Sequence, residues 1–221
     1  MRPLHRLLAL VLVLASLVVS TSALATHQDP QKRLTKADNA RARAMLVRRA
    51  DLPAGFQPQL SSTADPHTDC AAAVSESDLT LTGDAEGQQF ALGVGFVSSA
   101  AQVYKSLADA SASWRRTVSA PGTACAAETL RREFAKQGVD LVSLRKVAFP
   151  RLAERSVAYR VTLAATTAQG QVPVYVDLVA MARSRAHATV VVGSALVPPQ
   201  KAEELRLARI VAGRMTAAMR R

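Results

Sequence analysis

The sequence predicts an α+β domain, in which an antiparallel sheet with a three-stranded C-terminal meander packs against helices. The meander is predicted because residues 156–166, 172–181 and 188–196 alternate apolar and polar side chains and are joined by short links. Stretches with apolar residues at helical spacing precede and follow these strands. Strands in runs, with helices before and after them, are typical of α+β domains.

The first 25 residues have the order of a secretory signal peptide. Arg2 and Arg6 give a basic start, residues 7–19 are apolar apart from Ser16, and the segment closes on Ala23-Leu24-Ala25. We therefore expect cleavage after Ala25 and a secreted or extracytoplasmic protein. The alternative is an uncleaved N-terminal helix that anchors the chain in the membrane.

The remaining chain has the size and composition of one folded domain. Residues 26–34 are polar and predict a flexible start, and residues 35–221 predict a single α+β domain. The formal net charge is +11, or about +9 without the two signal-segment arginines, which favours weak association with anionic surfaces. The basic residues are spread over several helices instead of forming one run, so no specific nucleic-acid partner is expected.

In the first part of the domain we expect a helix over residues 36–49, capped by Thr35 and Asp38. Its apolar face would consist of Ala37, Ala40, Ala44 and Val47. Residues 79–82 and 88–97 then read as a hairpin of two strands.

Two helices are expected in the middle of the chain. The first would start at Ser98 or Ser99 and run to about Arg116. Its apolar residues recur at steps of four, three and four, at Val103, Leu107, Ala110 and Trp114. Pro121-Gly122 would end it, and a second helix would follow over residues 126–137.

A strand over residues 139–149, the meander and a last helix over residues 201–220 complete the domain. In the middle strand of the meander Val174, Val176 and Leu178 point inward, which puts Asp177 on the opposite face. A carboxylate on a covered face needs a partner. Arg160 on the neighbouring strand is the candidate, and we interpret the pair as a structural ion pair.

The chain has two cysteines, Cys70 and Cys125. An exported protein leaves the cytosolic reductants behind, so we expect these two to form a disulfide. A free reactive pair is the alternative.

No catalytic motif, metal-ligand spacing or cofactor fingerprint occurs in the sequence, so no catalytic residue, metal or cofactor is expected. His27, His67 and His187 are scattered, and we interpret them as solvated loop residues.

Several segments carry a resemblance to a known family. These are residues 51–56 (DLPAGF), the stretch from Trp114 to Cys125, residues 155–160 (RSVAYR), residues 172–179 and Arg214-Met215. With them the chain resembles the extracytoplasmic sensor domains of actinobacterial Ser/Thr kinases and their free-standing secreted relatives. The resemblance implies a helix-flanked antiparallel sheet with a central cleft, held by disulfides, that binds ligands and does not catalyse. This sequence differs by its single possible disulfide and by the absence of a kinase domain, and no binding residue carries over.

The leading hypothesis is an exported, non-enzymatic, ligand-binding or sensor-like domain of the cell envelope. Its ligand would come from the envelope or the extracellular medium, and the sequence identifies neither this ligand nor the oligomeric state. One alternative is a secreted hydrolase with dispersed catalytic residues, for which His187, His67 and Asp177 are the candidates. The other is a polybasic protein that associates with anionic envelope surfaces through the outward side of the last helix. The basic residues of that helix are Lys201, Arg206, Arg209, Arg214, Arg220 and Arg221.

Overall fold

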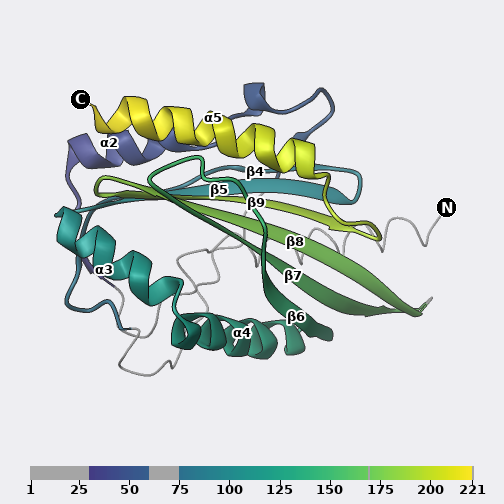
Figure 1. The fold of residues 1–221 in the computed structure, drawn as a ribbon. Helices are drawn as coiled ribbons and strands as arrows, with labels where there is room; N and C mark the ends of the chain where they lie inside the picture. Colours follow the sequence, from purple (N-terminus) through teal and green to yellow (C-terminus); the bar gives the residue numbers. More distant parts are fainter. Residues whose placement is uncertain (1–29, 60–74, 169, 221) are drawn as a thin grey trace.

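One mixed sheet organises the chain, with two helices on each of its faces (Figure 1). The computed structural model describes residues 30–59, 75–168 and 170–220. Within this part the sheet has nine strands in the order β1-β3-β5-β9-β8-β7-β6, with β4 beside β5 and β2 beside β4. The strands are β1 (Gln31–Lys32), β2 (Gln57–Gln59), β3 (Thr80–Glu86), β4 (Gln89–Leu92), β5 (Gly95–Tyr104), β6 (Val139–Val147), β7 (Arg155–Thr167), β8 (Gly170–Arg183) and β9 (Ala186–Ala195). The helices are α2 (Lys36–Met45), the short 3-10 helix η2 (Arg49–Asp51), α3 (Leu107–Thr117), α4 (Ala120–Ala135) and α5 (Lys201–Met219).

The predicted fold class and meander are confirmed. Strands β7, β8 and β9 follow one another as antiparallel neighbours, and β6 adds a fourth consecutive strand at the edge. The pairing of Asp177 with Arg160 on β7 and with Val192 on β9 places all three residues on one face.

The middle of the chain differs from the prediction. Ser98 and Ser99 lie inside β5, so the expectation that either of them caps a helix is wrong. Strand β5 pairs with β3, β4 and β9, and these long-range ladders outweigh the local cap signal. The predicted hairpin is also wrong, because β3 pairs with β5 and not with β4.

Helices α3 and α4 therefore begin elsewhere. Ser106 caps α3 and accepts a hydrogen bond from the backbone of Asp109, while Leu107 is 59% exposed and does not face the core as expected. Pro121 does not end a helix: it lies in the first turn of α4, where its missing N–H costs no hydrogen bond, and Ser119 is the cap.

The N-terminal helix has the predicted cap and a different buried face. Thr35 accepts a hydrogen bond from the Asp38 backbone at 3.1 Å. The buried residues of α2 are Asp38, Ala42 and Met45. The predicted apolar face is wrong for Ala37 and Ala40, which are exposed, whereas Ala44 and Val47 do pack on the core. Asp38 is buried because Arg185, in the turn between β8 and β9, binds it.

The two faces of the sheet have separate cores. Helices α2 and α5 cover one face, where Met45, Leu207 and Met215 pack on the side chains of β5, β8 and β9. Helices α3 and α4 lie on the other face (Figure 1), where Ala110 of α3 and Phe134 of α4 belong to different clusters. The interior of the second face is thus divided between two helices that do not share one core.

Several predictions concern residues outside the described part. The signal segment 1–25 lies there, and so do His27, His67 and Cys70. Of the expected flexible start, Gln31 and Lys32 form β1, which pairs in parallel with Thr80 and Leu81. No helix in residues 30–59, 75–168 and 170–220 is long and apolar enough to cross a membrane.

Candidate functional site

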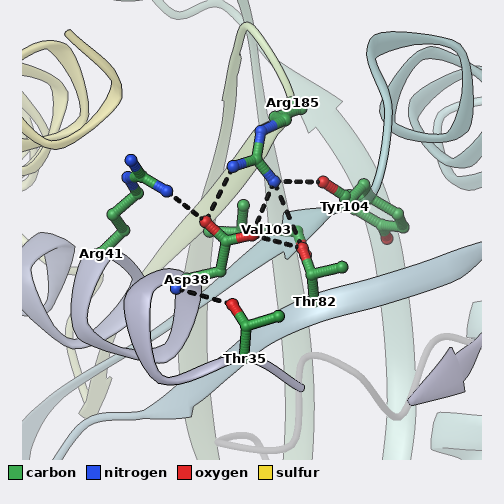
Figure 2. A network of polar contacts seen from close by, with 7 residues as sticks. All are labelled: Thr35, Asp38, Arg41, Thr82, Val103, Tyr104 and Arg185. Atoms are coloured by element: carbon green, nitrogen blue, oxygen red, sulfur yellow. Dashed lines mark hydrogen bonds and ion pairs between the residues drawn. The ribbon is translucent and has the colours of Figure 1, made fainter. Parts of the chain in front are cut away.

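Three groups of buried polar side chains are candidates for a functional site, and the first joins α2 to the sheet (Figure 2). Arg185, in the turn between β8 and β9, donates to both carboxylate oxygens of Asp38 at 2.8 Å. The same guanidinium donates to the Tyr104 carbonyl at 2.7 Å, and Arg41 donates to Asp38 at 2.6 Å. Thr82 completes the group by donating its hydroxyl to Asp38 at 2.7 Å.

This group has its hydrogen-bonding partners within the protein. The Arg185 hydrogen bonds hold the pKa of Asp38 far below its usual range, against the effect of burial. A carboxylate bound by two guanidinium groups and a hydroxyl has no lone pair directed at solvent. We assign the group to the attachment of α2 and not to ligand binding.

The second group lies under the first turn of α5, and it contains the two residues that the sequence suggested as an ion pair. The structure brings them together: Arg160 Nε lies 2.7 Å from Asp177 Oδ1, and its Nη2 lies 2.5 Å from Oδ2. The Asp177 side chain is 1% exposed, so the contact is buried on the carboxylate side.

Glu204 of α5 adds a second buried carboxyl group to this pair. Its Oε1 atom lies 3.8 Å from Arg160 Nη2, and its Oε2 atom lies 4.0 Å from Lys201 Nζ. Burial, followed by the hydrogen bond to Asp177 and its negative charge, raises the pKa of Glu204 to about 8. With a pKa of about 8, Glu204 holds its proton at neutral pH, so Arg160 lies beside one neutral and one charged carboxyl group.

The basic residues of α5 are largely engaged within the domain. Arg214 binds both carboxylate oxygens of Asp51, at 2.6 and 2.8 Å, and donates to the Leu46 carbonyl. Arg206 binds Glu203 and the Asp51 carbonyl, and Lys201 donates to the Ala148 carbonyl. Arg206 and Arg214 are half-buried and hold α5 against neighbouring segments, so the expectation that they project outward is wrong, whereas Lys201 and Arg209 are exposed.

Of the candidate residues of a dispersed hydrolase site, the two within the described part of the chain, Asp177 and His187, do not meet. Asp177 shares its sheet face with Val192, on the α2 and α5 side. His187 lies five residues before Val192 on β9. Because successive residues of a strand point to opposite faces, His187 points to the α3 and α4 side. A nucleophile and base cannot act together through a sheet, so this pair forms no catalytic dyad.

The third group lies on the α3 and α4 face, in the middle of the sheet. Ala100, Thr189 and Ala180 are direct cross-strand neighbours on β5, β9 and β8, and one row further on Gln102 lies opposite His187. Ser98 lies two residues before Ala100 on β5 and points to the same face. The ladder between β4 and β5 puts Gln89 beside Ser98. We call this set the central patch: Gln89, Ser98, Ala100, Gln102, Ala180, His187 and Thr189.

The central patch is only partly covered by the helices. Ala100, Thr189 and Ala180 are half-buried, while Ala101, Val190 and Val179, their sequence neighbours on the opposite face, are 0–2% exposed. Helix α3 packs at the Tyr104 end of β5, and α4 packs on β6 at the other side of the sheet. Small residues in strands allow another group to approach the sheet closely, and we call the row of small side chains between the two helices the floor of the central patch.

Buried polar atoms without partners border this floor. Gln89 and Ser98 are both 0% exposed, and neither the Gln89 amide nor the Ser98 hydroxyl has a hydrogen-bond partner. The His187 Nε2 atom is buried and unpartnered as well. Because an unsatisfied buried polar group costs about 1–3 kcal/mol, three of them around one floor require an explanation.

His187 lies between two aromatic rings. Its ring centroid is 4.9 Å from that of Tyr104 and 5.7 Å from that of Trp114 of α3. Burial lowers the pKa of His187 to about 4, with a backbone hydrogen bond to Ala110 acting in the opposite direction. The interpretation of His187 as a solvated loop residue is therefore wrong: the ring is neutral and lies on the sheet.

No direct signal for Gln89 or Ser98 is present in the sequence. Residues 88–97 were expected to form one strand, but they are divided between β4 and the start of β5, and Ser98 was assigned to a helix. For metals the structure offers no candidate in its described part, where no group of three or more His, Cys, Asp or Glu residues could hold an ion. Cys125 lies in α4, and its predicted disulfide with Cys70 stays a prediction.

Comparison with known proteins gives a likeness in fold. No protein-family model matches the sequence, and no curated protein matches it. The structure is similar to the crystal structure of the extracellular domain of PknH from Mycobacterium tuberculosis, with a TM-score of 0.41 and 9% identity over 83% of this chain and 97% of that chain.

Proposed function

We propose that this protein is an exported, non-enzymatic binding domain of the cell envelope that holds a ligand on the central patch. The observation that carries the proposal is the pair Gln89 and Ser98, fully buried and without partners beside a half-buried row of small residues. A bound molecule that hydrogen-bonds to them would remove the desolvation cost that they impose on the empty domain.

Export and the absence of catalysis are parts of this proposal. The signal segment with its Ala23-Leu24-Ala25 exit supports secretion with cleavage after Ala25. The separation of Asp177 and His187 on opposite faces speaks against the hydrolase that the sequence left open. The engagement of Arg206 and Arg214 within the domain makes the last helix a weaker candidate for attachment to anionic surfaces.

Native mass spectrometry of the full chain, isolated from the envelope and medium of the producing cells, tests the proposal. We expect an adduct on the wild-type protein that is lost on denaturation. Gln89→Met should lose the adduct, and Gln171→Met, which makes the same change at an exposed position of β8, should keep it. Circular dichroism establishes that both variants are folded. A wild-type protein free of any adduct, or equal occupancy in both variants, would contradict the proposal.

A further inference from the structure

The partnerless atoms of the central patch belong to uncharged groups. Gln89 offers an amide N–H donor and a carbonyl acceptor, and Ser98 offers a hydroxyl that can do either. Within the described strands, the ionisable side chains beside the central patch other than His187 are Asp84, opposite Gln102, and Glu86, Lys146 and Arg155 at the ends of the cross-strand rows. Asp84 is paired with Lys32 at 2.9 Å, and Arg155 donates to the Ser111 hydroxyl at 3.1 Å.

His187 adds a requirement for a donor on the ligand. Its Nε2 atom is buried and has no hydrogen-bond partner. A neutral imidazole has one donor and one acceptor nitrogen, and the tautomer with its proton on Nδ1 presents a lone pair at Nε2. A hydroxyl or amide N–H can donate to this atom, whereas an ionised carboxylate or phosphate oxygen has no proton to donate.

Aromatic side chains and the length of the central patch narrow the class of ligand further. Trp114 of α3 is half-buried next to His187, and Tyr159 of β7 is half-buried at the other end of the row that contains Ser98. His187 lies opposite Gln102, and Gln102 is four residues from Ser98 on β5. His187 and Ser98 are therefore roughly 13 Å apart along the strand direction. A ligand that reaches both must be elongated and must carry donors and acceptors along its length.

We infer that the central patch binds an uncharged saccharide chain, whose hydroxyl and acetamide groups hydrogen-bond to Gln89, Ser98 and His187 and whose ring faces pack against Trp114. This inference rests on the proposed function and names its ligand class. Saccharide hydroxyls both donate and accept, which suits a mixed set of amide, hydroxyl and imidazole partners. The apolar faces of sugar rings suit an aromatic side chain with a floor of small residues.

Trp114 provides the readout, since it is the only tryptophan in the chain. The secreted protein is titrated with the N-acetylglucosamine tetramer and, separately, with the hyaluronan tetrasaccharide, in which every second sugar carries a carboxylate. Trp114 fluorescence is followed in parallel with calorimetry. We expect saturable binding of the neutral tetramer with a change in Trp114 emission, and at least about tenfold weaker binding of the charged one.

Variants decide whether the binding occurs on the central patch. Ser98→Ala and Gln89→Met should each weaken binding of the neutral tetramer about tenfold, and Gln171→Met should leave it unchanged. The inference is overturned if calorimetry detects no binding of the neutral tetramer. It is also overturned if binding leaves Trp114 emission unchanged and the two patch variants bind as tightly as the wild type. A charged tetrasaccharide that binds as tightly as the neutral one, and loses affinity in Arg155→Gln, would overturn it as well. A non-saccharide adduct in the native mass spectra that depends on Gln89 would overturn this inference and leave the proposed function standing.

Discussion

Ser98 and Ser99 are neighbours in β5, and their side chains lie on opposite faces of the sheet. The two hydroxyls differ in their hydrogen bonding. The Ser99 hydroxyl, on the α2 and α5 face, accepts a hydrogen bond from the Val47 backbone at 2.9 Å. The Ser98 hydroxyl, on the α3 and α4 face, has no partner, although both side chains are buried. The fold therefore uses the hydroxyl on the first face and leaves the hydroxyl on the second face without a partner.

The same contrast holds for charge. The buried carboxyl groups Asp38 and Asp177 on the first face are each bound by a guanidinium. The unpartnered side chains of the central patch are uncharged. The buried carboxylates Asp38 and Asp177 are thus held by arginines, while the groups that we assign to recognition are uncharged.

The largest effect is expected where a charged partner is removed from the first face. Arg185→Met leaves Asp38 buried with Arg41 as its remaining cationic partner, and should lower the free energy of unfolding by about 3–5 kcal/mol. Urea unfolding measures the change. Arg43→Met, at an exposed position of α2, should stay within about 0.5 kcal/mol. A loss below about 1 kcal/mol in Arg185→Met would show that the Asp38 network does not stabilise the fold.

A smaller effect is expected at Glu204 and depends on pH. The pKa of Glu204 is about 8 in the folded chain and 4.5 as its ordinary value, so between these values the folded chain holds a proton that the unfolded chain has lost. The free energy of unfolding therefore falls as pH rises towards 8. Below pH 6.5 His187 acts in the opposite direction, because its folded-state pKa is lowered to about 4, so the window from 6.5 to 8 isolates Glu204.

Glu204→Gln should abolish this pH dependence. Between pH 6.5 and 8.5 the difference in the free energy of unfolding should change by roughly 2 kcal/mol in favour of the variant. Glu203→Gln is the matched control, since Arg206 lowers the pKa of Glu203 and no loss of stability between pH 6.5 and 8 is expected from it. Parallel stability curves for the wild type and Glu204→Gln across pH 6–9 would contradict a Glu204 that holds its proton at neutral pH.

The smallest effect compares the two serines directly. Ser99→Ala leaves the buried Val47 N–H without an acceptor and should cost about 1–3 kcal/mol. Ser98→Ala removes a hydroxyl that has no partner, and should change the free energy of unfolding by less than about 0.5 kcal/mol. Chemical denaturation of both variants provides the measurement. An equal loss in the two would mean that Ser98 has a structural partner in solution.

The sequence was informative where local pattern and pairing agree. Alternation in the three C-terminal strands predicted the meander, and with it the position of Asp177 beside Arg160. It failed at Ser98 and Ser99, because a polar residue before an apolar stretch is a cap signal, and only pairing with β9 reveals a strand. The burial of Asp38 was equally invisible, since its partner Arg185 is 147 residues away.

The candidate site was the least predictable part. Alternation indicates that Ser98 and Ser99 face opposite sides once the strand is known, but nothing local shows which of them finds a partner. Ser99 finds one because the end of α2 passes above it, a contact over 52 residues. His187 was identified as a residue of interest, and its neutral, buried state depends on α3 packing over it through Trp114.

A crystal structure of the secreted protein, isolated from the envelope without refolding, tests the central claim most directly. The account predicts electron density for a bound molecule on the central patch, within hydrogen-bond distance of the Gln89 amide, the Ser98 hydroxyl or His187 Nε2. Density in which these three groups bond only to other parts of the same chain, with the patch empty or covered, would contradict it.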